Sequence, residues 1–211
     1  MGRKRGAHGG FNLQGSMGSG KLTVRRVFLY LQPQMTAEEI YESVTNGGAS
    51  DFAQVVAILR RHGPWCLIGG LAVNCYVEPV YTIDADIVVV SQHLEAIRGE
   101  LAASGFQMEQ FAHSLNAKKA AGKLNIQFTQ DDRYQAFIAR AQAREVLGQS
   151  VPVADLNDLV QGKIWAWTDE KRRVSKRKKD ELDLIRIAEA YPELRGNMPK
   201  EITSQLEEDP A

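Results

Sequence analysis

Apolar and polar residues follow two different periods along this chain, and together they predict a mixture of helices and strands. Apolar residues recur at helical spacing over 52–59, and this helix is expected to end near Gly63. Further helices are expected at about 71–77, 94–104, 155–168 and 180–191. Short apolar or alternating runs predict strands at 65–68, 84–90, 106–111 and 124–129 and a loose hairpin over 144–153.

The order of these elements predicts an α+β fold, with a small mixed β-sheet, helices packed on it and a C-terminal helical lobe. Four regions are expected: a disordered, basic, glycine-rich leader (1–34), an α/β core (35–153), a helical lobe that completes the site (154–195) and an acidic, frayed tail (196–211). Thr36 and Glu39 form a capping-box pattern that marks the start of the ordered chain.

Composition narrows the class of protein. The 211 residues are 44% hydrophobic and carry no net charge, which is typical of a globular chain with one sizeable core. No apolar run is long enough to span a membrane, and the N-terminus lacks the apolar segment of a secretory signal. Cys66 and Cys75 lie in apolar segments and are interpreted as buried free thiols. We therefore expect a cytoplasmic protein.

A glycine turn and an aspartate pair are the main candidates for chemistry. An apolar run enters Gly69-Gly70 and leaves as an apolar helical segment, a strand–turn–helix pattern whose backbone N–H groups can receive an anion. The next predicted strand carries Asp84 and Asp86. Because strand side chains alternate, both carboxylates point to one face, roughly 6 to 7 Å apart. This arrangement suits chelation of Mg²⁺.

The C-terminal helices hold a second candidate cluster. Lys163 lies on an apolar helical stripe, so its ammonium either snorkels to solvent or meets an anion in a cleft. Seven of the nine residues 171–179 are basic, a pattern that fits either a solvated loop or a contact with phosphate or nucleic acid. Asp180 follows directly. It is interpreted as an N-cap by default, although it also lies toward the apolar face of its helix.

Taken together, these motifs resemble the polymerase-β-like nucleotidyltransferase superfamily and, within it, the AbiEii-type group, which includes toxins of type IV toxin–antitoxin systems. The resemblance covers about residues 36–195. It depends on four elements in the correct order: Gly69-Gly70, the Thr82-x-Asp84-x-Asp86 strand, the helix start 155–163 that ends in Lys163, and the Arg-Lys-Lys-Asp-Glu-Leu-Asp-Leu run at 177–184.

The resemblance implies that the chain moves a nucleoside monophosphate from a nucleoside triphosphate to an acceptor hydroxyl. The implied catalytic residues are Asp84, Asp86, Lys163 and Asp180. The implied nucleotide-binding residues are Gly69, Gly70, Thr82, Lys163, Arg177 and Lys179. Asp84 and Asp86 would ligate Mg²⁺. The acceptor could be RNA, a protein or a small molecule, and a cognate antitoxin protein is a further expected partner.

Two positions depart from the superfamily pattern, and one of them is Val80, which stands where an arginine is often found two residues before the motif threonine. A third carboxylate is usual on a later strand, and its place falls here on Asn125, or on Gln127 if the register is shifted by two residues. A neutral amide binds a metal more weakly than a carboxylate and cannot serve as a base. An alternative hypothesis therefore stands beside the enzyme, in which the chain is a catalytically impaired module that binds nucleotide or RNA.

Overall fold

The computed structural model describes residues 36–112 and 114–206, so the leader predicted at 1–34 lies outside the described residues. The helices of the described part are α2 (Ala37–Thr45), α3 (Gly48–Leu59), α4 (Gly69–Val73), α5 (Leu94–Ala103), α6 (Leu156–Thr168), α7 (Val174–Ala190) and α8 (Lys200–Thr203), with short 3-10 helices η1 (Ser91–His93), η2 (Asp132–Arg140), η3 (Pro192–Asn197) and η4 (Ser204–Leu206). The strands are β1 (Trp65–Ile68), β2 (Asp84–Val89), β3 (Gln107–Gln110), β4 (Ser114–Lys118), β5 (Asn125–Thr129), β6 (Gln142–Val146) and β7 (Gln149–Val153).

The described strands form one mixed sheet of seven strands in the order β3-β4-β5-β2-β1-β7-β6. Strand β2 is antiparallel to β1 and parallel to β5, and β7 is parallel to β1. The predicted α+β class with a mixed sheet is therefore confirmed. The capping box at Thr36 is also present at the start of α2.

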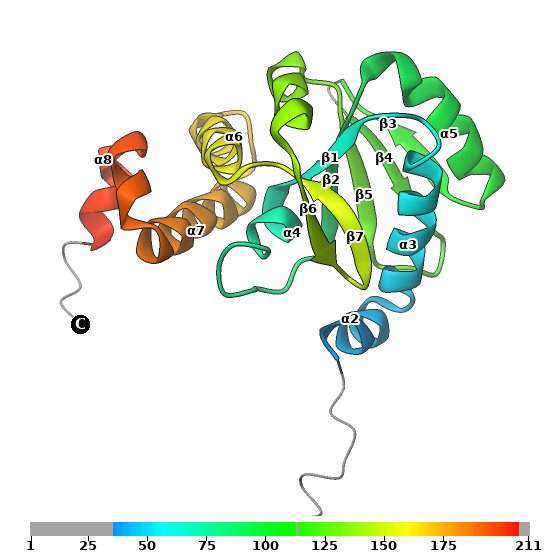
Figure 1. Ribbon diagram of the computed structural model, residues 1–211, viewed down its shortest axis with the longest axis horizontal. Coiled ribbons are helices and arrows are strands. Elements are labelled where there is room, and N and C mark those ends of the chain that lie inside the picture. The colour runs from blue at the N-terminus through cyan, green and yellow to red at the C-terminus, as the bar shows by residue number, and fades with distance from the viewer. Residues whose placement is uncertain (1–35, 113, 207–211) are drawn as a thin grey trace, which may run out of the picture. The chain divides into compact units, whose positions relative to one another are not determined.

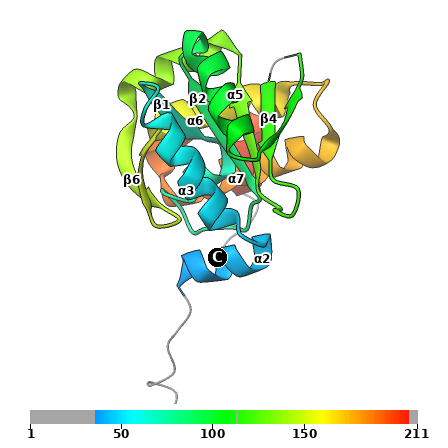
Figure 2. The same cartoon turned by 90° about the vertical axis from the view of Figure 1, so that its right-hand side faces the viewer.

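Strand β1 is buried along its whole length, whereas β2, β4 and β5 carry apolar side chains on one face and mainly polar ones on the other. The buried apolar side chains are Ala85, Ile87, Val89, Leu115, Ala117, Ile126 and Phe128. Helices α3 and α5 lie on one side of the sheet, and α4, α6 and α7 lie on the other (Figures 1 and 2). The apolar side chains pack with the buried faces of α3 and α5 in one core. This leaves the polar face of β2, β4 and β5 turned toward the side of α6 and α7.

The predicted hairpin is present as β6 and β7, which pair antiparallel. Its two turn residues, Leu147 and Gly148, have φ values of 48° and 72°. Two consecutive left-handed residues give the turn whose twist matches that of the flanking strands. Strand β7 then leads directly into α6, which places the C-terminal helices beside the centre of the sheet.

The C-terminal part of the chain differs from prediction in two places. Helix α7 begins at Val174 and not at Asp180, because most of the basic run consists of Lys and Arg, which are good helix formers. The residues after 195 were predicted to fray, yet η3 and α8 follow α7, and Ile202 is completely buried while Met198 is nearly so. These two apolar side chains anchor the segment to the core, and only 207–211 of the predicted tail lie outside the described residues.

The predicted helical lobe adjoins the core, since α6 and α7 both pack against α4. Cys66 is a buried free thiol and Cys75 is a half-buried one. Among the described helices, none combines the length and the apolar composition that crossing a membrane requires.

Candidate functional site

The glycine turn joins β1 to α4 and is held directly against the aspartate strand. Ile68 pairs with Asp86 across β1 and β2, so Gly69, the next residue, lies over the Asp86 side chain. Gly69 has φ +72°, and a Cβ atom added there would lie 2.0 Å from Asp86 Oδ2. Both the backbone conformation and the contact strongly disfavour any other residue. The turn and the carboxylate therefore form one structural unit.

Two carboxylates and two amides share the polar face of the sheet. In the parallel pairing of β2 with β5, Asp84 is opposite Asn125 and Asp86 is opposite Gln127. Asn125 Nδ2 donates a hydrogen bond of 3.3 Å to Asp84 Oδ1. Both positions considered for the third carboxylate are therefore amides, each beside one aspartate.

Asp84 is held in its ionised form by a lysine from α7. Lys176 Nζ lies 2.5 Å from Asp84 Oδ2. Burial raises the pKa of Asp84, but the hydrogen bond and the charge of Lys176 outweigh burial, so the pKa falls below its usual value. The Asp84 N–H donates to Thr82 Oγ1 at 3.3 Å, and Thr82 is itself buried. Residues from the strand, the loop before it and α7 thus meet at this carboxylate.

Asp86 has a different electrostatic environment. Burial raises its pKa from 3.8 to about 6, and the nearby positive charge of Lys163 offsets only part of that effect. The neighbouring charge of Asp84 acts in the same direction as burial. Two aspartates two residues apart on one strand therefore have pKa values shifted in opposite directions.

Lys163 meets anions, and these anions belong to the protein. Its Nζ lies 2.9 Å from Asp180 Oδ1 and 2.6 Å from Asp183 Oδ2, and the residue is only 8% exposed. Burial lowers the pKa of Lys163, but the two carboxylates outweigh it and the net shift is upward. Snorkelling, one of the two expected outcomes, is therefore wrong for this lysine.

Asp180 belongs to the same buried network and is not an N-cap. The N-cap of α7 is Arg173, and Asp180 is 3% exposed on the inner face of the helix. Arg172 Nε lies 2.8 Å from Asp180 Oδ2, and Arg186 Nη1 lies 2.7 Å from Asp183 Oδ1. Three cations and two carboxylates thus alternate in one network, which joins α6, the loop that follows it and α7. Arg186 also donates to the backbone carbonyl of Glu78 and to Asn74 Oδ1, which ties this network to the loop after α4.

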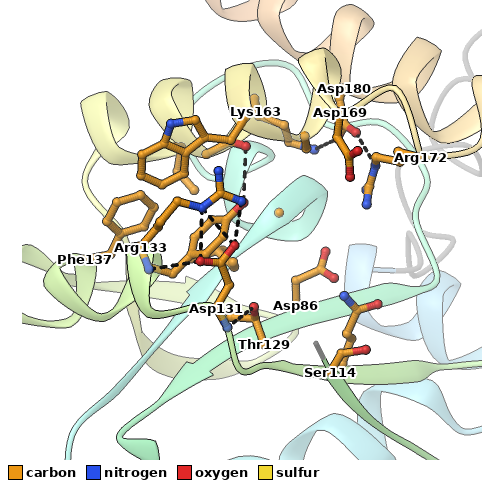
Figure 3. A pocket seen from close by; sticks show the side chains of 18 residues that line it. Asp86, Ser114, Thr129, Asp131, Arg133, Phe137, Lys163, Asp169, Arg172 and Asp180 are labelled. Atoms are coloured by element: carbon orange, nitrogen blue, oxygen red, sulfur yellow. Dashed lines mark hydrogen bonds and ion pairs between the residues drawn. The ribbon is translucent and has the colours of Figure 1, made fainter. Parts of the chain in front are cut away.

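Two clefts among the described residues meet at this network. The first, which we call the aromatic cleft, has a volume of about 250 Å³ and extends from Asp86 toward Tyr134, Phe137 and Trp165. Figure 3 shows Asp86 and Ser114 low in this cleft, Arg133 and Phe137 at one end, and Lys163 and Asp180 above. The second, the basic cleft, has a volume of about 100 Å³ and includes Asp84, Lys176 and Lys179. Both clefts are lined by Asp86, Gln127, Lys163, Arg172 and Asp180, which we call the shared wall.

The comparisons with known proteins bear on the fold. No protein-family model matches the sequence, and no curated protein matches it either. Among solved structures, ANT(2'')-Ia in complex with adenylyl-2''-tobramycin is similar over 75% of this chain and 98% of its own, with 13% identity and a TM-score of 0.52. This chain has a nucleotidyltransferase fold.

Two other solved structures are similar at lower TM-scores. An antigenic nucleotidyltransferase-like protein from Paracoccidioides brasiliensis shares 19% identity over 79% of this chain and 85% of its own, with a TM-score of 0.44. The lincosamide antibiotic adenylyltransferase LnuA, solved with lincomycin bound, shares 13% identity over 57% of this chain and 84% of its own, with a TM-score of 0.39. Of these three structures, ANT(2'')-Ia is the one with a TM-score above 0.5.

Within this nucleotidyltransferase fold, most of the predicted site residues come together. Gly69 lines the aromatic cleft, while Gly70, Thr82, Asp84 and Lys179 line the basic cleft. Asp86, Lys163 and Asp180 lie in the shared wall. Arg177 lies elsewhere. Its Nε donates to the backbone carbonyl of Trp167 at 2.8 Å, and it is not among the described residues that line either cleft.

Sequence reasoning missed several residues that line these clefts. Asp183 has a readable signal, because it lies three residues after Asp180 and shares its helix face. Lys176, at i−4 from Asp180, could have been found in the same way once the helix was extended. Arg172 belongs to the basic run 171–179, but nothing in that run distinguishes it from its neighbours. Arg133 comes from a 3-10 segment that shows no period, so no pattern in the sequence indicates it.

Oxygen ligands for a cation are concentrated at one place. Asp84 and Asp86 supply two carboxylates on one face, and Gln127 supplies an amide oxygen beside Asp86. In the described part of the chain, no group of three or more His, Cys, Asp or Glu could hold a metal ion. Two carboxylates are nevertheless enough for Mg²⁺, which commonly completes its shell with water and substrate phosphate.

Proposed function

We propose that this chain is a metal-dependent nucleotidyltransferase that moves a nucleoside monophosphate from a nucleoside triphosphate to an acceptor hydroxyl. One observation carries the proposal. Asp84 and Asp86 lie on one face of β2, directly against the Gly69 turn, with Lys176 and Lys179 in the adjoining cleft. Carboxylates for a metal and cations for phosphate thus lie side by side.

The donor set fits Mg²⁺. Asp84, Asp86 and Gln127 would hold the ion, and Asp84 already has a cation, the Lys176 ammonium, 2.5 Å from its Oδ2 atom. When bound, the ion supplies charge neutralisation and orientation of the phosphate oxygens. Gly69 supports this arrangement because the contact between its backbone and Asp86 fixes the position of that carboxylate.

The chain's own residues would perform the remaining tasks. Lys176 and Lys179 bind the β- and γ-phosphates in the basic cleft, while the shared wall holds the α-phosphate next to Asp86. The acceptor oxygen forms a bond to the α-phosphorus, and the bond from that phosphorus to the bridging oxygen of the β-phosphate breaks. The electron pair leaves with pyrophosphate, and the hydroxyl proton is released to solvent. Positioning and charge neutralisation supply most of the rate in such transfers.

The shared fold supports the proposal that the transferred group is a nucleoside monophosphate. ANT(2'')-Ia, whose fold this chain shares, was solved with an adenylylated molecule bound. The toxin role, the cognate antitoxin, the RNA acceptor and the cytoplasmic location stay predictions from the AbiEii-type resemblance.

The binding module remains the second candidate, and a specific observation favours it. Asn125 and Gln127 are both amides where a third carboxylate is usual, so no carboxylate on β5 can accept the hydroxyl proton. A module of this kind would bind nucleotide in the basic cleft without turning it over.

One experiment separates the two candidates. Purified protein is incubated with Mg²⁺, each α-³²P-labelled nucleoside triphosphate and a cell extract that supplies RNA, protein and small molecules. We expect labelled product from wild type, at least a hundredfold less from Asp84→Asn and Asp86→Asn, and wild-type amounts from Asp132→Asn, a matched change of an exposed aspartate outside both clefts. Nucleotide binding without transfer would favour the module, and neither binding nor transfer would reject both candidates.

A further inference from the structure

Despite its lysines, the basic cleft is balanced in charge at neutral pH. It is lined by four cations and four carboxylates, which are Lys163, Arg172, Lys176, Lys179, Asp84, Asp86, Asp180 and Asp183. A divalent cation that entered this cleft alone would leave an excess of positive charge, unless one of the resident cations withdrew. Entry of a metal ion thus depends on how firmly each resident cation is held.

Two of the resident lysines are held very differently. The Lys163 ammonium lies between two carboxylates of α7, and only 10% of its side chain is exposed. The Lys176 side chain is 33% exposed, and Asp84 is its single hydrogen-bond or ion-pair partner within the part of the chain that the structure describes. An ammonium on a flexible four-carbon stem can exchange one anion for another when it is this accessible. Lys176 is therefore the exchangeable cation at the aspartate pair.

The Lys176 ammonium lies where a metal ion would bind. Its Nζ atom is 2.5 Å from Asp84 Oδ2, while Asp84 Oδ1 accepts a hydrogen bond from Asn125, so both oxygen atoms of this carboxylate are engaged. An Mg²⁺ ion bound to Oδ2 at its usual distance of about 2.1 Å would lie within about 5 Å of the ammonium. Two cations this close, in a half-buried site, repel each other strongly. The ammonium and the metal ion therefore exclude each other at this oxygen.

Helix α7 also directs Lys176 toward the space proposed for phosphate. Lys176, Lys179 and Asp183 line the basic cleft from one face of the helix, at spacings of three and four residues. A triphosphate in this cleft would offer the Lys176 ammonium an anion in place of Asp84. Without nucleotide there is no such exchange, because the nearby Asp183 carboxylate is already paired with Lys163. Release of Asp84 by Lys176 is thus favourable only when phosphate is present.

We propose that Lys176 is an internal competitor for the metal position at Asp84. In the nucleotide-free protein its ammonium keeps a divalent cation out, and it moves to the phosphates when metal and nucleotide enter together. Metal and nucleotide then bind with positive cooperativity. This inference rests on the metal and nucleotide site of the proposed function, and it adds an earlier position of Lys176 to the one proposed on the β- and γ-phosphates.

Binding of Mn²⁺ to the full-length, nucleotide-free protein tests the competition without requiring turnover. Mn²⁺ is the probe because it accepts the same oxygen ligands as Mg²⁺ and the free ion is counted by electron paramagnetic resonance. We expect Lys176→Met to bind one Mn²⁺ at least tenfold more tightly than wild type. Lys176→Gln also removes the charge and should show the same gain, so it replaces the first variant if melting temperatures show that one to be unfolded. Lys176→Arg keeps a cation and should stay within threefold of wild type.

Two matched lysines separate competition at Asp84 from a general loss of positive charge. Lys179→Met removes one charge from the same cleft and leaves the contact between Lys176 and Asp84 intact, so its gain in Mn²⁺ affinity should be threefold at most. Lys178 is 69% exposed, pairs with Glu181 and lines neither cleft, so Lys178→Met should stay within twofold of wild type. Equal gains in the variants of Lys176 and Lys179 would contradict the competition.

A double variant locates the site that is gained. Adding Asp84→Asn to Lys176→Met removes the carboxylate for which ammonium and metal compete, so Mn²⁺ affinity should return to the wild-type value or below. A gain that survives this second substitution would place the ion elsewhere and reject the inference.

The outcomes also separate this inference from the proposed function. Label transfer that needs Asp84 and Asp86, together with unchanged Mn²⁺ affinity in Lys176→Met, overturns the competition and leaves the transferase in place. A tenfold gain in Mn²⁺ affinity without label transfer supports the competition and assigns it to the binding module. No Mn²⁺ binding by wild type or any variant counts against both the competition and the metal-dependent transferase.

Discussion

At the scale of single residues, the contact between Gly69 and Asp86 makes a prediction about stability. Gly69→Ala combines a left-handed backbone with a Cβ atom 2.0 Å from Asp86 Oδ2. We expect a loss of about 2 kcal/mol or more in the free energy of unfolding. Gly99→Ala is the matched control, because Gly99 lies in α5 with open space around it, and it should gain about 0.5 kcal/mol. Urea unfolding measures both, and equal midpoints for Gly69→Ala and wild type would contradict the contact.

The opposite pKa shifts of the two aspartates predict opposite effects of pH. Asp86 holds a proton in the folded state up to about pH 6, whereas the unfolded chain releases it near 3.8. The folded state therefore binds more protons in this window, and stability falls as pH rises through it, by roughly 3 kcal/mol from this group. Asp86→Asn removes that fall, so its advantage over wild type should grow between pH 4.5 and 7.

Asp84 provides the internal control for this prediction. Its pKa is lowered in the folded state, so its contribution is present above the unfolded value and is lost as pH falls. Asp84→Asn should therefore lose most stability relative to wild type at neutral pH. Urea unfolding at several pH values, in buffer containing EDTA, measures both variants. Parallel pH profiles for the two would show that the aspartates do not differ.

At the scale of elements, the ion pairs between α6 and α7 predict a strongly coupled pair of substitutions. Lys163→Met leaves the buried carboxylates of Asp180 and Asp183 without their shared cation. We expect a loss of about 3 to 5 kcal/mol in the free energy of unfolding. Adding Asp180→Asn removes one of the two carboxylate charges that lost this cation and should restore part of that loss. A double-mutant cycle in urea measures the coupling, and additive effects would mean that the pair does not interact.

The same helices show what the sequence could and could not predict. The face of α6 and the position of Lys163 on it follow from apolar periodicity. The start of α7 was placed six residues late, because a run of basic residues has no apolar period to mark the first turns of a helix. Strand β4 was not predicted, since Ser-Leu-Asn-Ala-Lys is short and contains residues that disfavour strands, although Leu115 and Ala117 do alternate with polar neighbours.

The candidate site was predictable where its residues are local and unpredictable where they depend on long-range pairing. Gly69, Asp84 and Asp86 belong to short motifs, so their chemistry could be inferred from spacing alone. The contact of Lys176 with Asp84 joins residues 92 positions apart, and the pairing of Gln127 with Asp86 depends on the register of β5. A pattern within a short stretch of sequence cannot indicate either of these long-range contacts. Which aspartate lies opposite Asn125 and which lies opposite Gln127 is therefore known only from the sheet itself.

At the scale of the whole described chain, the C-terminal segment predicts a stability effect far from both clefts. Ile202 is completely buried, and Met198 beside it is almost so. Ile202→Ala should lower the free energy of unfolding by about 2 to 5 kcal/mol, because it removes buried methyl groups and leaves a cavity. Ser204→Ala, an exposed position two residues later, is the control and should change little. Equal melting temperatures for the two variants would show that this segment is frayed and does not contribute to the core.

The shared wall has a thermodynamic consequence for the molecule as a whole. A ligand that contacts the shared wall from one cleft touches side chains that also face the other cleft. We expect such a ligand to change the free energy of binding in the other cleft. Linkage requires that this coupling be reciprocal: whatever factor the first ligand applies to the affinity of the second, the second returns to the first. Through these five side chains, the two small clefts would act as a heterotropic pair.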